Sequence, residues 1–246
     1  MTEAAAPEET LAAMRARLQE QCRVPPLPTD WEWASAMVSA EGLDFGGDFF
    51  VAAPLQTSEG PGLQMVLVDV CGNGAKALPA ATRLADTIRG LVATQPYDGV
   101  MPAVSAHLNA LEDPEAFATA CQVVLSFTTG RYEIRSAGHP PVLRWDSAAG
   151  EWSIDSARGM ALGIQDSPEL HHSAGTLAPD EGLLFYTDGV VETRTSDFDE
   201  GVEWLRDVAR SELRQGWPGL AGRLLADVTQ GADDRAVLVL RRCRGI

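Results

Sequence analysis

Four aspartates, each at one end of an apolar segment, are the residues of this chain whose type and position could do chemistry. Asp69 follows a short β-branched run and precedes two glycines, which is typical of a buried strand that ends in an open loop. Asp188 ends another apolar run, whereas Asp48 and Asp233 come just before segments of strand-like composition. Taken singly, an aspartate beside a glycine is more often a turn residue than a ligand.

The recurrence of the pattern suggests a shared site. In an antiparallel sheet the exit of one strand lies beside the entry of its neighbour, so all four carboxylates can converge on a single rim. Clustered carboxylates raise one another's pKa unless cations lie among them. Oxygen ligands suit Mg²⁺ or Mn²⁺, and no His or Cys stands at the same strand ends, which argues against zinc. Two such ions about 3.5–4 Å apart can activate a water molecule that attacks a phosphoryl group. The alternative, that each aspartate caps its own turn, stays open at this point.

The remaining elements must position these carboxylates. Apolar spacing predicts a helix from Pro7 to Arg23, closed by a Pro-rich linker, and a second helix over Ala75–Ala93. The three strands around and before Asp69 are expected to pair as hairpins across loops, the last loop covering 56–62. Strand runs alternating with two helix pairs disfavour a doubly wound parallel sheet and predict one α+β domain over 29–246, after a helix and linker at 1–28.

Composition excludes several classes of function. The chain has 246 residues, 45% hydrophobic content and a formal net charge of −16, so nucleic acid and anionic membranes are not expected as partners. No apolar run reaches the roughly 18 residues of a membrane span, and no signal peptide is evident. The four cysteines are widely spaced without a CxxC pair, which favours a reduced, cytoplasmic setting.

Five motifs in order resemble one known family, the sporulation stage II E and sigma-regulator branch of the PP2C-like (PPM) serine/threonine phosphatases. The resemblance runs from about Trp31 to Arg242. The motifs are Gly46-Gly47-Asp48-Phe49-Phe50, Asp69-Val70-Cys71-Gly72-Asn73-Gly74, Ser136-Ala137-Gly138-His139-Pro140-Pro141, Leu183-Leu184-Phe185-Tyr186-Thr187-Asp188-Gly189 and Asp233-Asp234-Arg235-Ala236.

The resemblance implies an α-β-β-α sandwich of two antiparallel sheets with a Mg²⁺- or Mn²⁺-dependent site, holding two ions, at one edge. It implies that Asp69 bridges both metals beside the Val70 carbonyl, that Asp188 and Asp233 bind one metal, and that Asp48 lies on the side of the other. A bridging hydroxide would attack phosphorus in line, without a covalent phosphoenzyme. The implied substrate is phosphoserine or phosphothreonine on an anti-anti-sigma (STAS-like) protein.

Three positions depart from the family pattern. Val51 stands where a further aspartate is usual, Cys71 replaces a serine, and Ala236 replaces a threonine. These departures leave open a catalytically silent PPM fold that only binds a regulatory protein. A different dinuclear hydrolase, acting on small phosphodiesters, is a further alternative.

Other candidate residues receive plainer interpretations. His139 could act as a general acid, but shaping a turn is the favoured role, and His171 and His172 are expected in a polar loop. Asp234 is expected to support the ligands or a turn. Regulation is expected through a protein partner that contacts the N-terminal helix or the Ala75–Ala93 helix.

Overall fold

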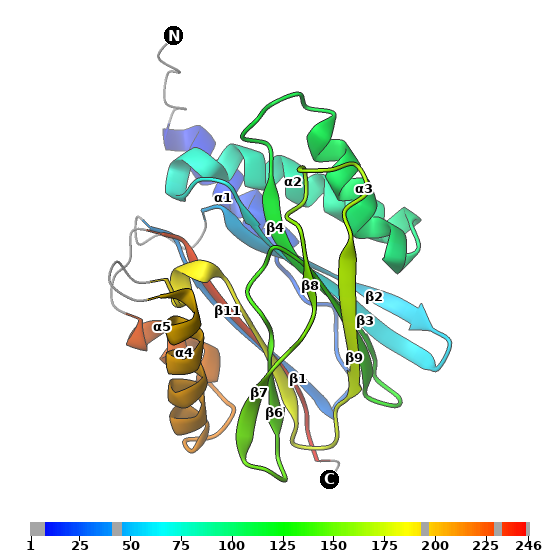
Figure 1. The fold of residues 1–246 in the computed structure, drawn as a ribbon, viewed down its shortest axis with the longest axis vertical. Coiled ribbons are helices and arrows are strands. Elements are labelled where there is room, and N and C mark those ends of the chain that lie inside the picture. The colour runs from blue at the N-terminus through cyan, green and yellow to red at the C-terminus, as the bar shows by residue number, and fades with distance from the viewer. Residues whose placement is uncertain (1–7, 41–45, 193–196, 229–232, 245–246) are drawn as a thin grey trace.

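Two antiparallel sheets stacked face to face make up the centre of the molecule (Figure 1). The computed structural model describes residues 8–40, 46–192, 197–228 and 233–244. The five-stranded sheet has the order β1 (Trp31–Val38), β11 (Arg235–Arg242), β10 (Gly182–Tyr186), β6 (Leu143–Asp146), β7 (Glu151–Ile154). The six-stranded sheet has the order β2 (Asp48–Thr57), β3 (Gly60–Val70), β4 (Ala118–Ser126), β5 (Arg131–Ala137), β9 (Leu170–Thr176), β8 (Arg158–Gly159).

Helices cover the outer face of each sheet (Figure 1). The helices α1 (Glu8–Gln21), α2 (Gly74–Thr94) and α3 (Tyr97–Asn109) lie over the six-stranded sheet, and α4 (Phe198–Leu213) and α5 (Leu220–Asp227) over the five-stranded sheet. A 3₁₀ turn, η1 (Asp188–Val190), follows β10. This is the α-β-β-α sandwich that the resemblance implied, and the observed α2 agrees with the predicted helix to within one residue at each end.

Side-chain alternation along β2 and β3 sets which residues face the space between the sheets. Val51 packs in the core under the helices, whereas Phe50 and Leu67 belong to the core between the two sheets. Because successive strand residues point to opposite faces, Asp48 and Asp69 share the inward face with Phe50 and Leu67. Both carboxylates therefore project between the sheets at the end of the sandwich.

Some expectations about local structure are wrong. β1 does not form a hairpin with β2 but pairs with β11 at the edge of the other sheet, because its apolar face completes the core that α4 and α5 cover. The expected loop at 56–62 is only a two-residue turn, since β2 runs to Thr57 and β3 begins at Gly60. His171 and His172 lie in β9, whose polar pattern resembles a loop because the strand is largely exposed.

The described helices include none that is both long and apolar enough to cross a membrane.

Candidate metal centre

Asp48 and Asp69 are direct neighbours across the β2–β3 pair, where they are register partners. Opposite residues in an antiparallel pair hold their Cβ atoms about 4.5–5.5 Å apart. Asp48 is buried, 3% exposed, and Asp69 is half-buried. The fold therefore forces two acidic side chains together in a place that is poorly accessible to water.

The five-stranded sheet contributes the other two predicted aspartates. Asp188 begins η1 two residues after the end of β10, and Asp233 lies two residues before the start of β11. The negative charges of Asp188 and Asp233 both act on Asp69, so residues from the two sheets meet at one end of the sandwich. The sequence predicts convergence on the rim of a single sheet. In the structure the convergence instead comes from the stacking of two sheets, whose relevant strand ends lie at the same edge.

The electrostatics of the cluster are those of carboxylates without a counter-charge. Burial raises the pKa of Asp69 to about 8, and the charges of Asp188 and Asp233 add to that effect. Burial likewise raises the pKa of Asp188 to about 6, with Glu192 contributing. The pKa of Asp48 lies well above its usual range because of burial and then the charge of Asp69. Burial also raises the pKa of Asp233. A bound cation would relieve this unfavourable charge.

Asp234 organises the backbone around the cluster rather than joining it. Its buried carboxylate accepts hydrogen bonds from the backbone N–H groups of Ala40 (2.8 Å), Gly47 (2.5 Å) and Gly74 (3.0 Å). A Cβ atom at Gly46 would lie 2.3 Å from the carboxylate oxygens, so only glycine permits this approach. Asp234 therefore holds the backbone before Asp48, which explains the Gly-Gly pair there; its support of metal ligands stays a prediction.

Thr187 is a residue that the sequence argument missed. Its hydroxyl donates a hydrogen bond to Asp48 Oδ2 at 2.7 Å. The hydroxyl oxygen, Thr187 Oγ1, in turn accepts a hydrogen bond from the backbone N–H of Ala236 at 2.9 Å. The available signal was its position, since Thr187 is a buried polar residue directly before Asp188. This hydrogen bond links the two sheets at the carboxylate cluster.

His139 extends the row of polar groups across the six-stranded sheet. Asp69 is the register partner of Thr119, and Thr119 Oγ1 lies 2.8 Å from His139 Nδ1. Burial lowers the pKa of His139 to about 3, against a smaller opposing effect of the Tyr186 backbone. A neutral, buried imidazole of this kind supports the structural role and is a poor proton donor near neutral pH.

The oxygen donors of the cluster fit a hard divalent cation that takes two carboxylates from the protein and its other ligands from water or phosphate. Among the residues that the structure describes, no three His, Cys, Asp or Glu side chains are placed to hold a metal ion jointly. Mg²⁺, however, usually keeps several waters and takes one or two carboxylates together with phosphate oxygens. The pair Asp48–Asp69 meets that need, and the Val70 carbonyl lies nearby, 3.1 Å from where a Cβ of Gly47 would stand.

Comparison with known proteins identifies the family. The family model for stage II sporulation protein E (SpoIIE) matches residues 59–243, which is most of the chain. The chain belongs to the SpoIIE family. Four of the five motifs fall inside the matched range, whereas the motif containing Asp48 precedes it.

Relatives of known structure or name agree with this assignment to the SpoIIE family. The phosphoserine phosphatase RsbP of Bacillus subtilis (strain 168) is 26% identical over 141 residues, which cover 54% of this chain but only 34% of RsbP. The RsbU and RsbW domains of Rv1364c from Mycobacterium tuberculosis match with a TM-score of 0.74 and 25% identity, over 92% of this chain and 63% of theirs. RsbX, solved in complex with magnesium, matches with a TM-score of 0.63 and 16% identity over 87% of this chain and 96% of RsbX.

The departures from the SpoIIE-family pattern lie outside the carboxylate cluster. Val51 is buried in the core under the helices, on the face of β2 opposite to Asp48. Ala236 contributes its backbone N–H, which any residue except proline provides, to Thr187. Cys71 is exposed, and desolvation and the charge of Glu115 raise the pKa of its thiol, which disfavours a nucleophilic thiolate.

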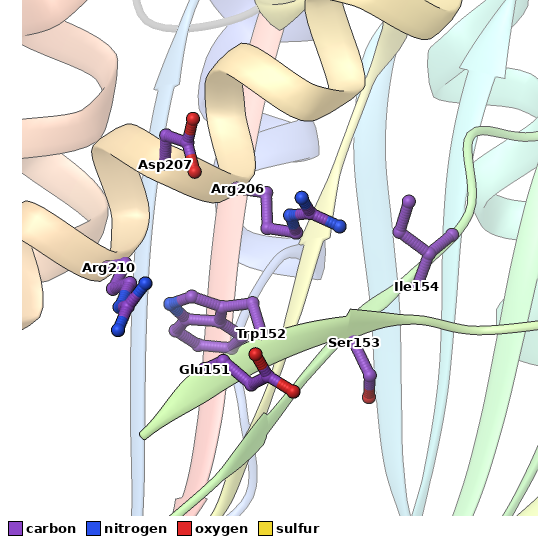
Figure 2. Close-up of a pocket in the computed structure, with 7 residues that line it drawn as sticks. All are labelled: Glu151, Trp152, Ser153, Ile154, Arg206, Asp207 and Arg210. Atoms are coloured by element: carbon purple, nitrogen blue, oxygen red, sulfur yellow. The ribbon is translucent and has the colours of Figure 1, made fainter. Parts of the chain in front are cut away.

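Among the cavities lined by described residues, two of similar size differ in their distance from the carboxylate cluster. One, of about 320 Å³, has Asp188 in its wall together with His139 and Arg158. The other, of about 340 Å³, lies between β7 and α4 (Figure 2), where Trp152 faces Arg206 and Arg210. Only the first of these two adjoins the carboxylate cluster.

Proposed function

We propose that this chain is a Mg²⁺- or Mn²⁺-dependent protein serine/threonine phosphatase whose substrate is a phosphorylated anti-anti-sigma (STAS-like) regulator. The observation that carries the proposal is the convergence of Asp48, Asp69, Asp188 and Asp233 from two sheets. Membership of the SpoIIE family supports it, as does the name of RsbP, a phosphoserine phosphatase. Because the chain spans only about a third of RsbP, the activity of the whole protein belongs to the proposal.

The residues would act as ligands and as a rigid frame. Asp69, with the Val70 carbonyl, would hold both of two ions, and Asp48 would lie beside one of them. Asp188 and Asp233 would bind the other ion, for which their side chains would have to move closer to Asp69 than they stand in this structure. When bound, divalent ions supply an activated water at neutral pH and neutralise charge on phosphoryl oxygens. Asp234 and Thr187 would fix the ligand positions through the hydrogen bonds described above.

A metal-dependent assay tests the proposal. Phosphate release from a phosphoserine peptide should require Mn²⁺ or Mg²⁺. The rate should fall at least about 100-fold in Asp69→Asn, because loss of a residue that only supports a metal ligand already lowers activity by up to about 100-fold. Asp207→Asn, an exposed acid on α4 in the other cavity, is the matched control and should keep full activity. Metal-independent release, or equal loss in both variants, contradicts the proposal.

The second candidate is a catalytically silent SpoIIE-family fold that binds a regulatory protein. The absence of the usual acid and threonine at Val51 and Ala236 is the observation that favours it. In that case the wild-type chain would bind the phosphorylated regulator without releasing phosphate at any metal concentration. Activity on small phosphodiesters rather than phosphoserine peptides would instead indicate another dinuclear hydrolase.

Regulation is proposed to act through α1 or α2. α1 packs on α2 through buried Leu18, and Arg17 forms an ion pair with Asp86 at 2.6 Å. The first residue of α2, Gly74, donates its backbone N–H to Asp234. A partner that shifts α2 would therefore move Asp234 and the backbone around Asp48. A cytoplasmic location and a separate unit at 1–28 stay predictions from the sequence.

A further inference from the structure

The cavity beside Asp188 has a composition unlike that of a simple phosphate site. It is open to solvent and is lined by residues of the β5–β6 connection, β8 and η1 and by the first residue of α4. Its volume of about 320 Å³ reaches the lower end of the range for sites that hold drug-sized ligands. Much of the wall is apolar, from Pro140, Pro141, Ala157 and Phe198. A phosphoryl group alone would leave most of this space unfilled.

One cation in the described wall of this cavity forms no ion pair. Arg158 is exposed, and within the described ranges its guanidinium takes part in no hydrogen bond or ion pair. Its register partner across β8 and β9 is His171, which is also exposed. Asp188 and Glu192 line the same cavity, yet Arg158 is paired with neither. In a chain with a net charge of −16, a free arginine beside the reaction site is a specific place for an anion.

We propose that this cavity holds the polypeptide flanking the phosphorylated residue and that Arg158 pairs with an acidic side chain of that polypeptide. The inference rests on the proposed function for its substrate class. The apolar wall receives the aliphatic or aromatic side chains of the segment, while Asp188 lies where the cavity meets the carboxylate cluster. Arg158 is thus a specificity-determining residue that contacts the substrate protein and has no part in the attack on phosphorus.

The test compares binding and turnover of matched phosphoserine peptides that carry Glu, Gln or Lys beside the phosphoserine. Binding is followed by fluorescence anisotropy of labelled peptides, so this readout needs no turnover. Arg158→Glu should weaken binding of the Glu peptide about tenfold, because attraction becomes repulsion. The same variant should leave the Gln peptide nearly unchanged and should tighten binding of the Lys peptide.

Arg210→Glu is the matched control, because Arg210 is also an exposed arginine in the wall of a cavity of similar size (Figure 2). It should bind all peptides like the wild type. In turnover assays, Arg158→Gln, which adds no negative charge beside Asp188 and Glu192, should raise KM for the Glu peptide several-fold more than KM for an aryl phosphate.

Two results would overturn the inference: unchanged binding of the Glu peptide in Arg158→Glu, or an equal loss for the Gln peptide and the aryl phosphate. The second would mean that Arg158 contacts the phosphoryl group itself. Absence of turnover in the wild type with intact, Arg158-dependent peptide binding would count against the phosphatase proposal and in favour of this cavity.

Discussion

Thr187, at the end of β10, donates its hydroxyl hydrogen to Asp48, the first residue of β2, across 2.7 Å. The hydroxyl oxygen of Thr187 accepts a hydrogen bond from the backbone N–H of Ala236, near the start of β11. One buried hydroxyl thus links both sheets next to the carboxylate pair Asp48–Asp69. Its loss should affect the stability of the fold and the geometry of the metal centre together.

Replacing Thr187 by Val keeps the shape of the side chain and removes the hydroxyl. The variant leaves the Ala236 N–H and one Asp48 oxygen without a partner, which should lower the free energy of unfolding by about 1–3 kcal/mol. Mn²⁺ affinity should fall about 10–100-fold. Urea unfolding and calorimetric Mn²⁺ titration measure the two effects. Thr187→Ser, which retains the hydroxyl, should recover most of both; equal behaviour of the two variants would mean that the hydrogen bond is unimportant.

Substitution of Asp234 should mainly lower stability, whereas substitution of its neighbour Asp233 should mainly weaken Mn²⁺ binding. Asp234→Ala removes the acceptor of three backbone N–H groups and should cost at least about 2 kcal/mol of stability, because buried donors lose their partners. Asp233→Asn keeps the Oδ1 atom that accepts the backbone N–H of Asp234, so it should leave stability nearly unchanged while weakening Mn²⁺ binding. Chemical denaturation and metal titration of both variants check this contrast, and a stable Asp234→Ala would contradict the assigned role.

Divalent ions should stabilise the protein more at pH 8 than at pH 5. The pKa of Asp69 is about 8 in the metal-free folded state and about 3.9 in the unfolded chain. Between these two pH values the folded state keeps a proton that the unfolded state has released. The metal-free protein therefore loses stability as pH rises towards 8. Mn²⁺ at about 100 times its Kd should add about 2.7 kcal/mol, or about 5–10 °C in Tm. Thermal unfolding with Mn²⁺ or EDTA at both pH values measures this; a Tm that Mn²⁺ leaves unchanged at pH 8 argues against the centre.

His139 should make the fold sensitive to acid. Its pKa falls to about 3 in the folded state, whereas the unfolded chain binds the proton near 6.5. The contribution of His139 to stability is therefore constant above about pH 6.5 and is lost as pH falls towards 3. Between pH 7 and pH 5 this contribution falls by about 2 kcal/mol, whereas the raised pKa values of Asp69 and Asp188 act in the opposite direction. The difference in stability between the wild type and His139→Gln should therefore change by about 2 kcal/mol between the two pH values. Urea denaturation at the two pH values decides the matter; identical pH profiles would exclude His139 as the cause.

Much of the fold was predictable because local patterns determine it. Helical spacing located α2 to within one residue, and the β4–β5 hairpin follows from a Thr-Gly turn between strand-like runs. The pairing of β1 with β11 was not predictable, because it joins segments from opposite ends of the chain and no local signal encodes such a contact. β9 was missed because its exposed residues lack an apolar alternation.

The candidate site was predictable in its carboxylates but not in its support. The sequence identifies four candidate aspartates, because each lies at the end of a predicted strand and within one of the motifs: Asp48, Asp69, Asp188 and Asp233. Thr187 and the three backbone donors to Asp234 make hydrogen bonds to residues far away in the sequence, which become visible only in the folded structure. The same holds for the cavity that Arg158 shares with Asp188.

The most direct measurement of the central claim is a crystal structure of the protein grown with Mn²⁺, recorded at the manganese absorption edge. We expect anomalous density between Asp69, the Val70 carbonyl and Asp188 or Asp233, with further density near Asp48 when two ions bind. Anomalous density absent from this end of the sandwich, with Mn²⁺ in excess, would contradict the account.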